Sequence, residues 1–377
     1  MLGLNGLRIV PNYRSGNPYD AWVDYVKAWT SIPSGDPGPD NAKSICRLAF
    51  LDLAGIGFFS YPLGCPSWVP NFSELAKMGQ TPIKSDPLTK HMMLAGADDA
   101  LEIDDGILKV KGRVVQRICR TALLDRVQED TDLTTGFAVA RSILRYLGGF
   151  VARNPRYITG DSPLHAFTRV LLNQSDVQPV SEELFRQGFE LLLSCCAILS
   201  GSLNTENFEN TARNELGLDP GTKPVRWLVD NFWTASEIRQ SGISKRTILR
   251  SARRSIGTIG KKMTENFVAI HKLFNTDIIF ETEDGYVGAC PRHSQIGDVV
   301  CAIYGYKHLV VLRPCEGGYQ FVGKASAWGF MSGEAFLVRR EAASWLPDWL
   351  LRAVNRMRHI SEEEVVLVSD LQTLEIV

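Results

Sequence analysis

Between residues 276 and 335 the chain alternates short apolar runs with glycine-containing turns, and this stretch constrains the fold most strongly. Asp284-Gly285, Gly305 and Glu316-Gly317-Gly318 separate runs that are rich in β-branched and aromatic residues. Turns at intervals of roughly 8–12 residues between such runs are typical of antiparallel strands. The runs are 278–280, 285–289, 299–304, 309–312 and 319–325. The stretch therefore predicts a small curled sheet or a partly closed barrel.

Two of these runs, Val299–Ile303 and Leu309–Leu312, are apolar at every position. A strand without polar alternation is buried on both of its faces. We therefore expect helices from elsewhere in the chain to pack against the sheet.

The N-terminal part mixes helix and strand signals. Asn17-Pro18 provides an N-cap followed by proline at the first helical position, and apolar residues from Trp22 to Trp29 recur at helical spacing. Residues 100–118 alternate in period two around Asp104-Asp105-Gly106, which predicts a β-hairpin. Trp68 lies between two prolines in an extended segment, and we expect it to anchor a core.

From residue 135 to residue 275 the periodicity becomes helical. The predicted helices are 137–147, 164–172, 184–199, 225–233 and a long one at 244–274. The stretch 201–223 is rich in Gly, Asn and Thr and is interpreted as a linker. Nearer the C-terminus we expect a helix at 342–357 and a strand at 364–368.

These patterns predict an α+β fold with a mixed N-terminal part, a helical middle, and a small C-terminal antiparallel β-sheet or barrel packed by helices. The expected domain ranges are 1–134, 135–275, 276–340 and 341–377, the last holding a helix and a strand.

Composition limits the classes of partner and the compartment. The formal net charge of −1 gives no global reason to expect nucleic acid or an anionic membrane as partner. Eight cysteines lie scattered without framework spacing, which favours free thiols in a reducing compartment. No signal peptide is recognisable, and no run reaches the roughly 18 apolar residues of a membrane span. We therefore expect a cytoplasmic protein with no membrane span.

The segment 245–262 combines a basic face with an apolar stripe. Its cations are Lys245, Arg246, Arg250, Arg253, Arg254, Lys261 and Lys262, and the first acidic residue after them is Glu265. Such a face can bind the phosphates of nucleic acid, of a nucleotide or of a lipid surface, with Arg250, Arg253 and Arg254 as candidate binding residues. A solvated face that pairs with carboxylates elsewhere is the alternative, and the near-zero net charge favours it.

Cys290 and His293 are the residues from which a hidden Cys/His enzyme could be built, and Cys301 and Cys315 could complete a zinc site with them. No third residue that would orient the histidine can be named, and Cys301 and Cys315 lie in separate apolar runs. The segment 255–262 resembles a phosphate-binding loop but lacks its first glycine and its final Ser/Thr. We therefore expect no catalytic residues, no metal and no cofactor.

Asp298, Arg313 and Glu334 are polar points within the most apolar part of the chain. An arginine at the end of a buried strand needs an anionic partner, so we expect Arg313 to bond a carboxylate such as Asp298 or Glu334. The glycine-containing segment 329–335 could line a small pocket, which keeps a ligand- or partner-binding role open for these residues.

Several motifs occur in a fixed order in this region. They are Gly285-Tyr286-Val287-Gly288, Gly297-Asp298-Val299-Val300, Val311-Leu312-Arg313-Pro314, Gly318-Tyr319, Val322-Gly323 and the segment 329–335. Together they resemble the C-terminal region of fungal heterokaryon-incompatibility (HET) domain proteins. The segments 1–13 and 66–72 resemble parts that follow the HET domain in such proteins, although Cys65 stands where the family usually has Leu.

The resemblance implies a non-catalytic regulatory or recognition region that acts in fungal allorecognition, heterokaryon incompatibility and programmed cell death. It also implies a protein partner, with a HET domain in cis or in trans as the candidate. The resemblance does not include a HET domain, so the chain is expected to follow a missing one, and whether Met1 is the natural start stays open.

Overall fold

The structure is a computed structural model of the 377-residue chain. The residues it describes are 19–30, 48–57, 64–72, 75, 101–122, 133–172, 182–200, 205–232, 277–306, 308–330, 337–339, 364–366, 371–377 and the positions 234, 235, 238, 239, 242–244, 246, 247, 250, 251, 254 and 255. Helices and strands are both present, so the expected α+β class is confirmed.

The chain divides into two compact units. Unit 1 comprises residues 1–117, 293–325 and 330–377, and unit 2 comprises residues 118–292 and 326–329. Two long strands each continue from one unit into the other, so neither unit is a continuous piece of chain. The four consecutive domain ranges expected from the sequence stay a prediction.

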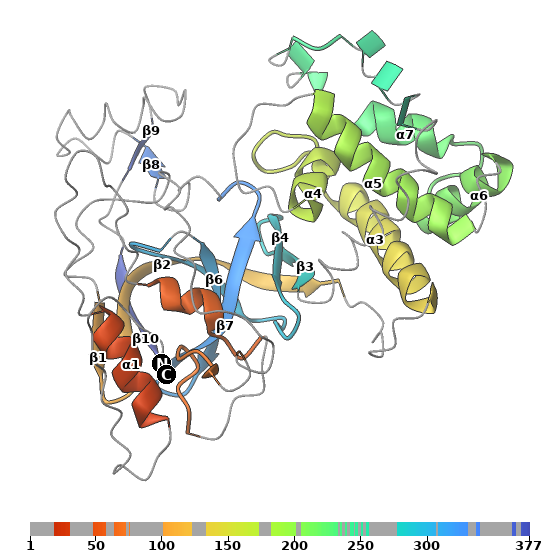
Figure 1. Ribbon diagram of the computed structural model, residues 1–377. Helices are drawn as coiled ribbons and strands as arrows, with labels where there is room; N and C mark the ends of the chain where they lie inside the picture. Colours follow the sequence, from red (N-terminus) through yellow and green to blue (C-terminus); the bar gives the residue numbers. More distant parts are fainter. Residues whose placement is uncertain are drawn as a thin grey trace, which may run out of the picture. The chain divides into compact units, whose positions relative to one another are not determined.

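Unit 1 is built on a closed ring of strands (Figure 1). Its members are β2 (Ile107–Thr121), β5 (Val299–Ile303), β6 (Leu309–Cys315), β7 (Gly318–Ala327) and β10 (Gln372–Ile376). The antiparallel pairs are β2–β5, β5–β6, β6–β7 and β10–β2, and a parallel pairing of Ile376 with Tyr319 joins β10 to β7 and closes the ring. Closure removes the unpaired edges that an open sheet would expose. We call this ring the barrel.

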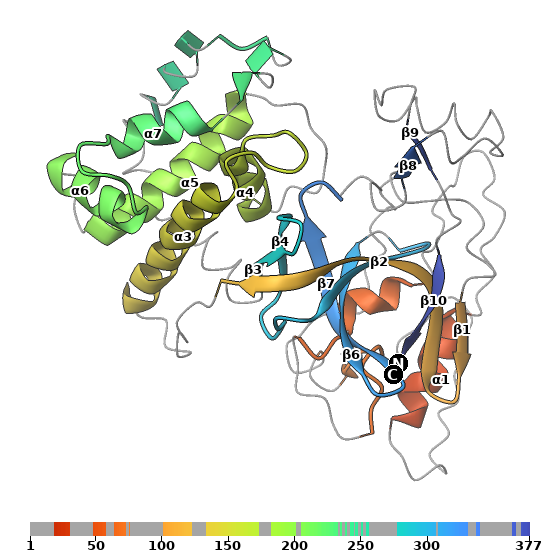
Figure 2. The same ribbon diagram turned by 180° about the vertical axis from the view of Figure 1, so that it is seen from behind.

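Strand β5 and residues 309–312 of β6 are buried on both faces, as the unbroken apolar runs predicted. Val299, Cys301 and Ile303 on β5 belong to one hydrophobic core, while the alternate residues Val300 and Ala302 are buried outside it. Helix α1 (Asp20–Thr30) and the 3₁₀-helix η1 (Ala49–Leu53) supply further residues to this core, so packing by helices is confirmed. Figure 2, which views the molecule from the side opposite to Figure 1, shows α1 beside β1 (Leu101–Asp104) and β10.

The predicted hairpin is formed by β1 (Leu101–Asp104) and β2, with Asp104 paired to Ile107. Both turn residues have positive φ, 44° at Asp105 and 77° at Gly106, which is the turn geometry that matches the twist of paired strands. The buried Trp68 donates its indole N–H to the Gly106 carbonyl at 2.9 Å. Trp68 is therefore the core anchor that the sequence predicted.

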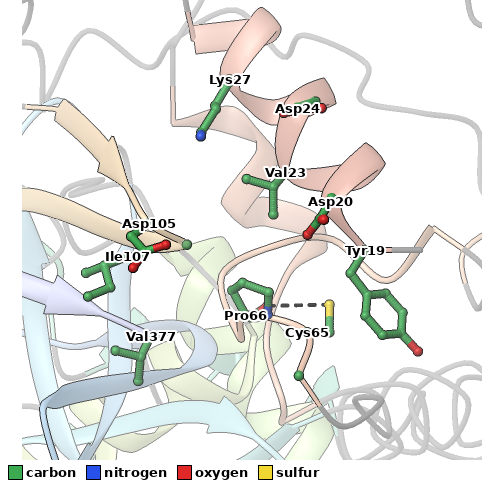
Figure 3. A pocket seen from close by; sticks show the side chains of 12 residues that line it. Tyr19, Asp20, Val23, Asp24, Lys27, Cys65, Pro66, Asp105, Ile107 and Val377 are labelled. Carbon is green, nitrogen blue, oxygen red and sulfur yellow. Dashed lines mark hydrogen bonds between the residues drawn. The ribbon is translucent and has the colours of Figure 1, made fainter. Parts of the chain in front are cut away.

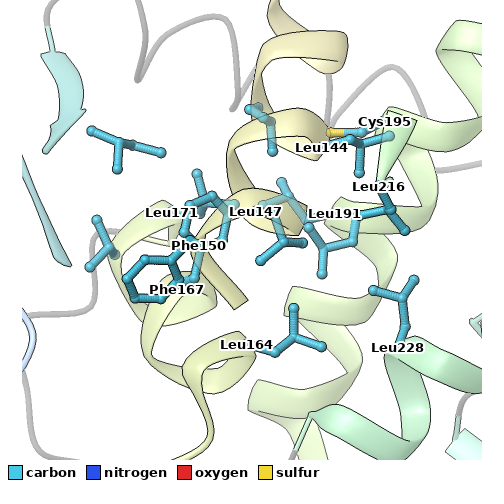
Figure 4. Close-up of a cluster of buried hydrophobic side chains, with 14 of the residues drawn as sticks. Leu144, Leu147, Phe150, Leu164, Phe167, Leu171, Leu191, Cys195, Leu216 and Leu228 are labelled. Atoms are coloured by element: carbon cyan, nitrogen blue, oxygen red, sulfur yellow. The ribbon is translucent and has the colours of Figure 1, made fainter. Parts of the chain in front are cut away.

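Unit 2 is mainly helical. Its helices are α3 (Leu133–Arg153), α4 (Pro163–Leu171), α5 (Glu182–Ser200), α6 (Thr205–Glu215) and α7 (Pro224–Asn231). Leucine and phenylalanine side chains from these helices interdigitate in one core (Figure 4). Strands β3 (Asp277–Thr282) and β4 (Val287–Pro291) pair with each other and with the last residues of β2 and β7. The strands expected at 278–289 are therefore confirmed, but they belong to the helical unit.

The interpretation of 201–223 as a linker is wrong, because α6 occupies residues 205–215. The helix is polar overall, so few apolar residues mark it in the sequence, and Ala212 within it and Leu216 just beyond its end are buried. Gly148 on α3 lies against the Leu216 carbonyl, where a side chain would overlap backbone atoms. Close approach at a glycine therefore joins α6 to α3.

Near the C-terminus β8 (Leu337–Arg339) pairs with β9 (Glu364–Val366), which confirms a strand in the expected 364–368 region. The expected helix at 342–357 lies outside the described residues. Most of the helix expected at 244–274 does so as well, although the backbone is helical at the described positions between 246 and 255.

Candidate functional site

A six-residue loop, His293–Asp298, precedes β5 and is organised by one buried carboxylate. Asp298 is 2% exposed. Arg313 on β6 donates from Nε to Asp298 Oδ1 at 2.9 Å and from Nη2 to Asp298 Oδ2 at 3.1 Å. This two-point geometry is the strong form of an arginine–carboxylate contact. The expected partner of Arg313 is therefore confirmed as Asp298.

The same two side chains fix the backbone of the loop. Asp298 Oδ2 accepts the Gln295 amide at 2.8 Å, and the Asp298 amide donates to the Gln295 carbonyl at 3.1 Å. Arg313 Nη2 also donates to the His293 carbonyl at 2.8 Å. From β2, Arg117 Nη1 donates to the Gly297 carbonyl at 3.1 Å. Hydrogen bonds from two barrel strands therefore hold the loop in one conformation.

The loop presents an apolar side chain to solvent. Two large hydrophobic residues in the described part of the chain are exposed. They are Ile296 in the loop, at 68%, and Ile158 in unit 2, at 49%. Gly297, next to Ile296, has φ of 96°, which favours glycine there. A large apolar residue held outward on a rigid loop is a feature of protein-recognition surfaces, although single exposed apolar residues are also common.

Of the other four candidate binding residues, two lie in unit 2 and two lie outside the residues that the structure describes. Arg250 and Arg254 have helical backbone in unit 2 and are exposed, and Arg246 one turn earlier is exposed as well. Arg253 and Glu334 lie outside the described residues. The structure therefore brings Asp298 and Arg313 together, and it places Arg250 and Arg254 in the other unit.

Cys290 and His293, from which the sequence could build a Cys/His pair, differ in their exposure to solvent. Cys290 is fully buried on β4, while His293 is exposed. Burial raises the pKa of two other thiols, that of Cys65 to about 11 and that of Cys195 to about 12. A nucleophilic cysteine needs the opposite shift. Among the described residues, no group of three or more His, Cys, Asp or Glu side chains is placed to hold a metal ion.

Sequence reasoning missed an open pocket of about 610 Å³ in unit 1. One wall is α1 with Asp20, Val23 and Lys27, and the opposite wall is the β-hairpin turn with Asp105 and Ile107 (Figure 3). The 3–4-residue spacing of Asp20, Asp24 and Lys27 places them on one helix face, but only the fold brings Asp105 opposite. The lining holds three aspartates against one lysine and is therefore acidic.

Sequence reasoning also missed a buried arginine in unit 2. Arg169 on α4 is 1% exposed, and its guanidinium carbon lies 4.7 Å from the centre of the Trp328 ring. Arg169 Nε donates to His165 Nε2 at 3.0 Å. Trp328 is fixed by a 2.6 Å hydrogen bond from its Nε1 to Asp161 Oδ2 and by the Tyr157 hydroxyl, which donates to its carbonyl at 2.7 Å. A cation–π contact of this kind stabilises a buried cation that water no longer reaches.

The family model of the Het-6 beta-barrel domain matches residues 246–346. The match contains β3 to β8, whereas β2 and β10, which complete the barrel, lie outside it. Comparison with curated proteins and with solved structures finds no match. The matched domain supports a fungal HET-related protein and points to the heterokaryon-incompatibility family, in agreement with the resemblance found in the sequence. Within the described residues no helix is long and apolar enough to cross a membrane.

Proposed function

We propose that this chain is a non-catalytic recognition region of a HET-like protein, which acts in fungal allorecognition and the programmed cell death that follows incompatibility. In this role it binds a protein partner in the cytoplasm, with a HET domain in cis or in trans as the candidate. Recognition is the task of the barrel, and the chain does not itself execute death.

The observation that carries this proposal is the rigid His293–Asp298 loop on a barrel that overlaps the Het-6 beta-barrel match. Three side chains, Arg117, Arg313 and Asp298, each make a hydrogen bond to the backbone of the six-residue loop, and Ile296 is exposed on that loop. Buried polar networks that order a surface loop reduce the entropy lost on binding, which favours a recognition role.

The chemistry of the cysteines supports the non-catalytic part of the proposal. The thiols with clearly shifted pKa are shifted upward by burial, so they are protonated and poorly nucleophilic at neutral pH. His293 has its backbone, not its ring, in the loop network.

Expression in a fungal host tests the proposal. The chain alone, the chain fused to a HET domain, and the fusion carrying Ile296→Ala are compared for cell death. We expect no death from the chain alone, death from the fusion, and weaker death from the fusion with the altered loop. Death caused by the chain alone and abolished by Cys290→Ser or His293→Ala would show that an active site exists here.

A second candidate function is phosphate binding through the arginines near residue 250. Arg246, Arg250 and Arg254 are exposed at four-residue intervals with helical backbone, which puts them on one face. Binding of a nucleic acid through this face should fall steeply with salt, and the triple change to alanine should reduce the salt slope by about 3. Binding that is insensitive to both salt and the triple change would remove this candidate.

A further inference from the structure

Strand β1 leaves one of its backbone edges open. It stands at the end of the sheet order, outside the closed ring, and pairs with β2. The two-residue turn makes Asp104 and Ile107 a hydrogen-bonded pair, and bonded and non-bonded pairs alternate along an antiparallel ladder. Leu101 and Ile103 therefore direct their N–H and C=O groups away from β2. Within the described residues, these backbone groups of Leu101 and Ile103 have no hydrogen-bond partner.

Strand β1 alternates between apolar and acidic side chains. Leu101 and Ile103 are partly buried and pack against the barrel core, whereas Glu102 and Asp104 are exposed. An open strand edge is a template for a further strand, and side chains that lie opposite one another on paired strands share a face of the sheet. An added strand would therefore place one set of side chains beside the aliphatic pair and the alternate set beside the acidic pair. Basic and aliphatic residues in alternation match this edge in charge and in polarity.

The turn end of β1 adds further negative charge. Asp20 and Asp24 on α1 and Asp105 in the turn line the pocket of about 610 Å³, with Lys27 as the cation in the lining (Figure 3). Within the described residues, the carboxylates of these three aspartates and of Glu102 form no hydrogen bond and no ion pair. The pocket is large enough to take a lysine side chain from a strand that continues past the end of β1. Four such carboxylates on one surface favour a cationic partner.

We propose that β1 is a docking edge for an extended segment of a partner protein, in which basic and aliphatic residues alternate and one basic side chain enters the pocket between α1 and the turn. The added segment pairs with Leu101 and Ile103 through its backbone and with Glu102 through a basic side chain. Pairing of β1 with β1 of a second copy is disfavoured, because it sets carboxylates against carboxylates. This inference goes beyond the proposed function and does not depend on it, since that function rests on the His293–Asp298 loop.

Binding of a short peptide to the full chain tests the proposal. The probe is the capped peptide Lys-Val-Lys-Val-Lys-Val-Thr with a fluorescent label, and fluorescence anisotropy measures its dissociation constant. A strand of four residues offers few backbone bonds, so we expect weak binding that falls with salt. The peptide Lys-Lys-Lys-Val-Val-Val-Thr has the same composition without the alternation and should bind about tenfold more weakly.

Methylation of the peptide backbone separates strand addition from charge attraction. In antiparallel pairing, the valines lie opposite Leu101 and Ile103 and exchange backbone hydrogen bonds with them. Methyl groups on the valine amide nitrogens should therefore reduce the affinity about tenfold or more, whereas methyl groups on the lysine amide nitrogens point away from β1 and should leave it nearly unchanged. Both peptides carry the same charge, and the protein is unaltered in both measurements.

A change of charge on β1 tests the acidic side of the contact. Glu102→Lys turns an attractive cross-strand pair into a repulsive one and should weaken peptide binding about fivefold or more. Asp219→Lys, at an exposed aspartate of unit 2, is the matched control with the same charge change and should bind the peptide like the unaltered chain. Unchanged hydrogen exchange of the residue-102 amide, which bonds β2, shows that the hairpin is intact in the variant.

The pocket is tested by Asp20→Asn combined with Asp105→Asn. Asparagine tolerates the positive φ at position 105, so the turn keeps its conformation. Loss of two carboxylates from the lining should weaken peptide binding about threefold or more.

Hydrogen exchange of the unaltered chain gives the most direct readout. Bound peptide should newly protect the Leu101 and Ile103 amides. Equal affinity for the two methylated peptides, equal binding by Glu102→Lys and Asp219→Lys, unchanged binding after the double change in the pocket, or no binding at about 1 mM peptide would overturn the proposal. Protection of the Leu101 and Ile103 amides that rises with protein concentration in the absence of peptide would also overturn it, because the occupant would then be a second copy.

Discussion

The barrel and the helical unit both bury an apolar core, but they assemble it from residues at very different sequence separations. In the barrel, Gly112 of β2 pairs with Ile303 of β5 on one side and with Gln372 of β10 on the other. In unit 2, α3 to α6 follow one another along the chain and pack on their near neighbours, as Figure 4 shows for residues from α3, α4 and α5. The comparison teaches that most of the core of unit 2 joins helices that follow one another along the chain, with β3 and β4 added from farther away, whereas the barrel depends on long-range pairing throughout.

The first prediction removes one aromatic side chain from each core. Phe321 in the barrel and Phe167 on α4 are both fully buried. Phe321→Ala and Phe167→Ala should each lower the free energy of unfolding by about 3–5 kcal/mol, since transfer energy is lost and a cavity remains. Chemical denaturation measures the loss, and hydrogen exchange should show the weakened strands in one variant and the weakened helices in the other. A loss under about 1 kcal/mol for Phe321→Ala would mean that the barrel core is not packed as described.

The second prediction compares a buried ion pair of the barrel with an exposed one of the helical unit. Asp298→Ala leaves Arg313 without its carboxylate and should cost about 3 kcal/mol, the low end for a broken buried pair because Arg313 keeps some exposure. Arg226→Ala breaks the exposed contact with Asp230 on α7 and should cost under about 1 kcal/mol. If urea denaturation showed that both variants lose the same free energy of unfolding, the burial of Asp298 would be contradicted.

The third prediction uses two adjacent glycines of α3. A side chain at Gly148 would overlap the Leu216 carbonyl, whereas one at Gly149 would meet the end of the flexible Arg153 side chain at 2.9 Å. Gly148→Ala should therefore lower the free energy of unfolding by about 1–3 kcal/mol, because the added methyl group overpacks the contact. Gly149→Ala gains helix propensity of about 1 kcal/mol, so its net effect should be small or stabilising. Thermal unfolding of the two variants side by side decides whether α6 packs at Gly148.

The fourth prediction concerns alkaline pH. Burial raises the pKa of Cys195 from 9.0 to about 12, so the folded chain keeps a proton that the unfolded chain loses. Its contribution is fully present below pH 9 and is lost as the pH rises toward 12, which lowers stability by up to about 1.4 kcal/mol per pH unit. Cys195→Ala should make the decline between pH 9 and pH 11 shallower in denaturation measurements. An unchanged slope would mean that Cys195 is accessible to water.

Sequence reasoning located most strands and helices because each carries a local pattern. The runs at 299–304 and 309–312 became β5 and β6, and the helical periodicity of 164–172 became α4. Reasoning from local patterns also paired Arg313 with Asp298, since a buried cation needs an anion nearby. It missed α6, because that helix is polar overall and contains few apolar residues.

Other features depend on pairings that no local pattern contains. β10 is only five residues long, and its place between β2 and β7 follows from closure of the barrel. The pocket requires α1 and the hairpin turn to face each other, and the contact of Arg169 with Trp328 joins residues from α4 and the end of β7. Strands β3 and β4 fall in unit 2, although they belong to the same eight-stranded sheet as β5, β6 and β7.

Hydrogen exchange of β10 tests the closed barrel most directly, since β10 joins β2 to β7 and completes the platform for the His293–Asp298 loop. The Val377 amide donates to the Tyr319 carbonyl at 2.8 Å, and β10 pairs with β2 along its length. If the ring opens as one unit, amides of β10 bonded to β2 should exchange at rates within about tenfold of those in β6. Exchange in β10 at the rate of a fraying terminus, with β6 still protected, would contradict the account.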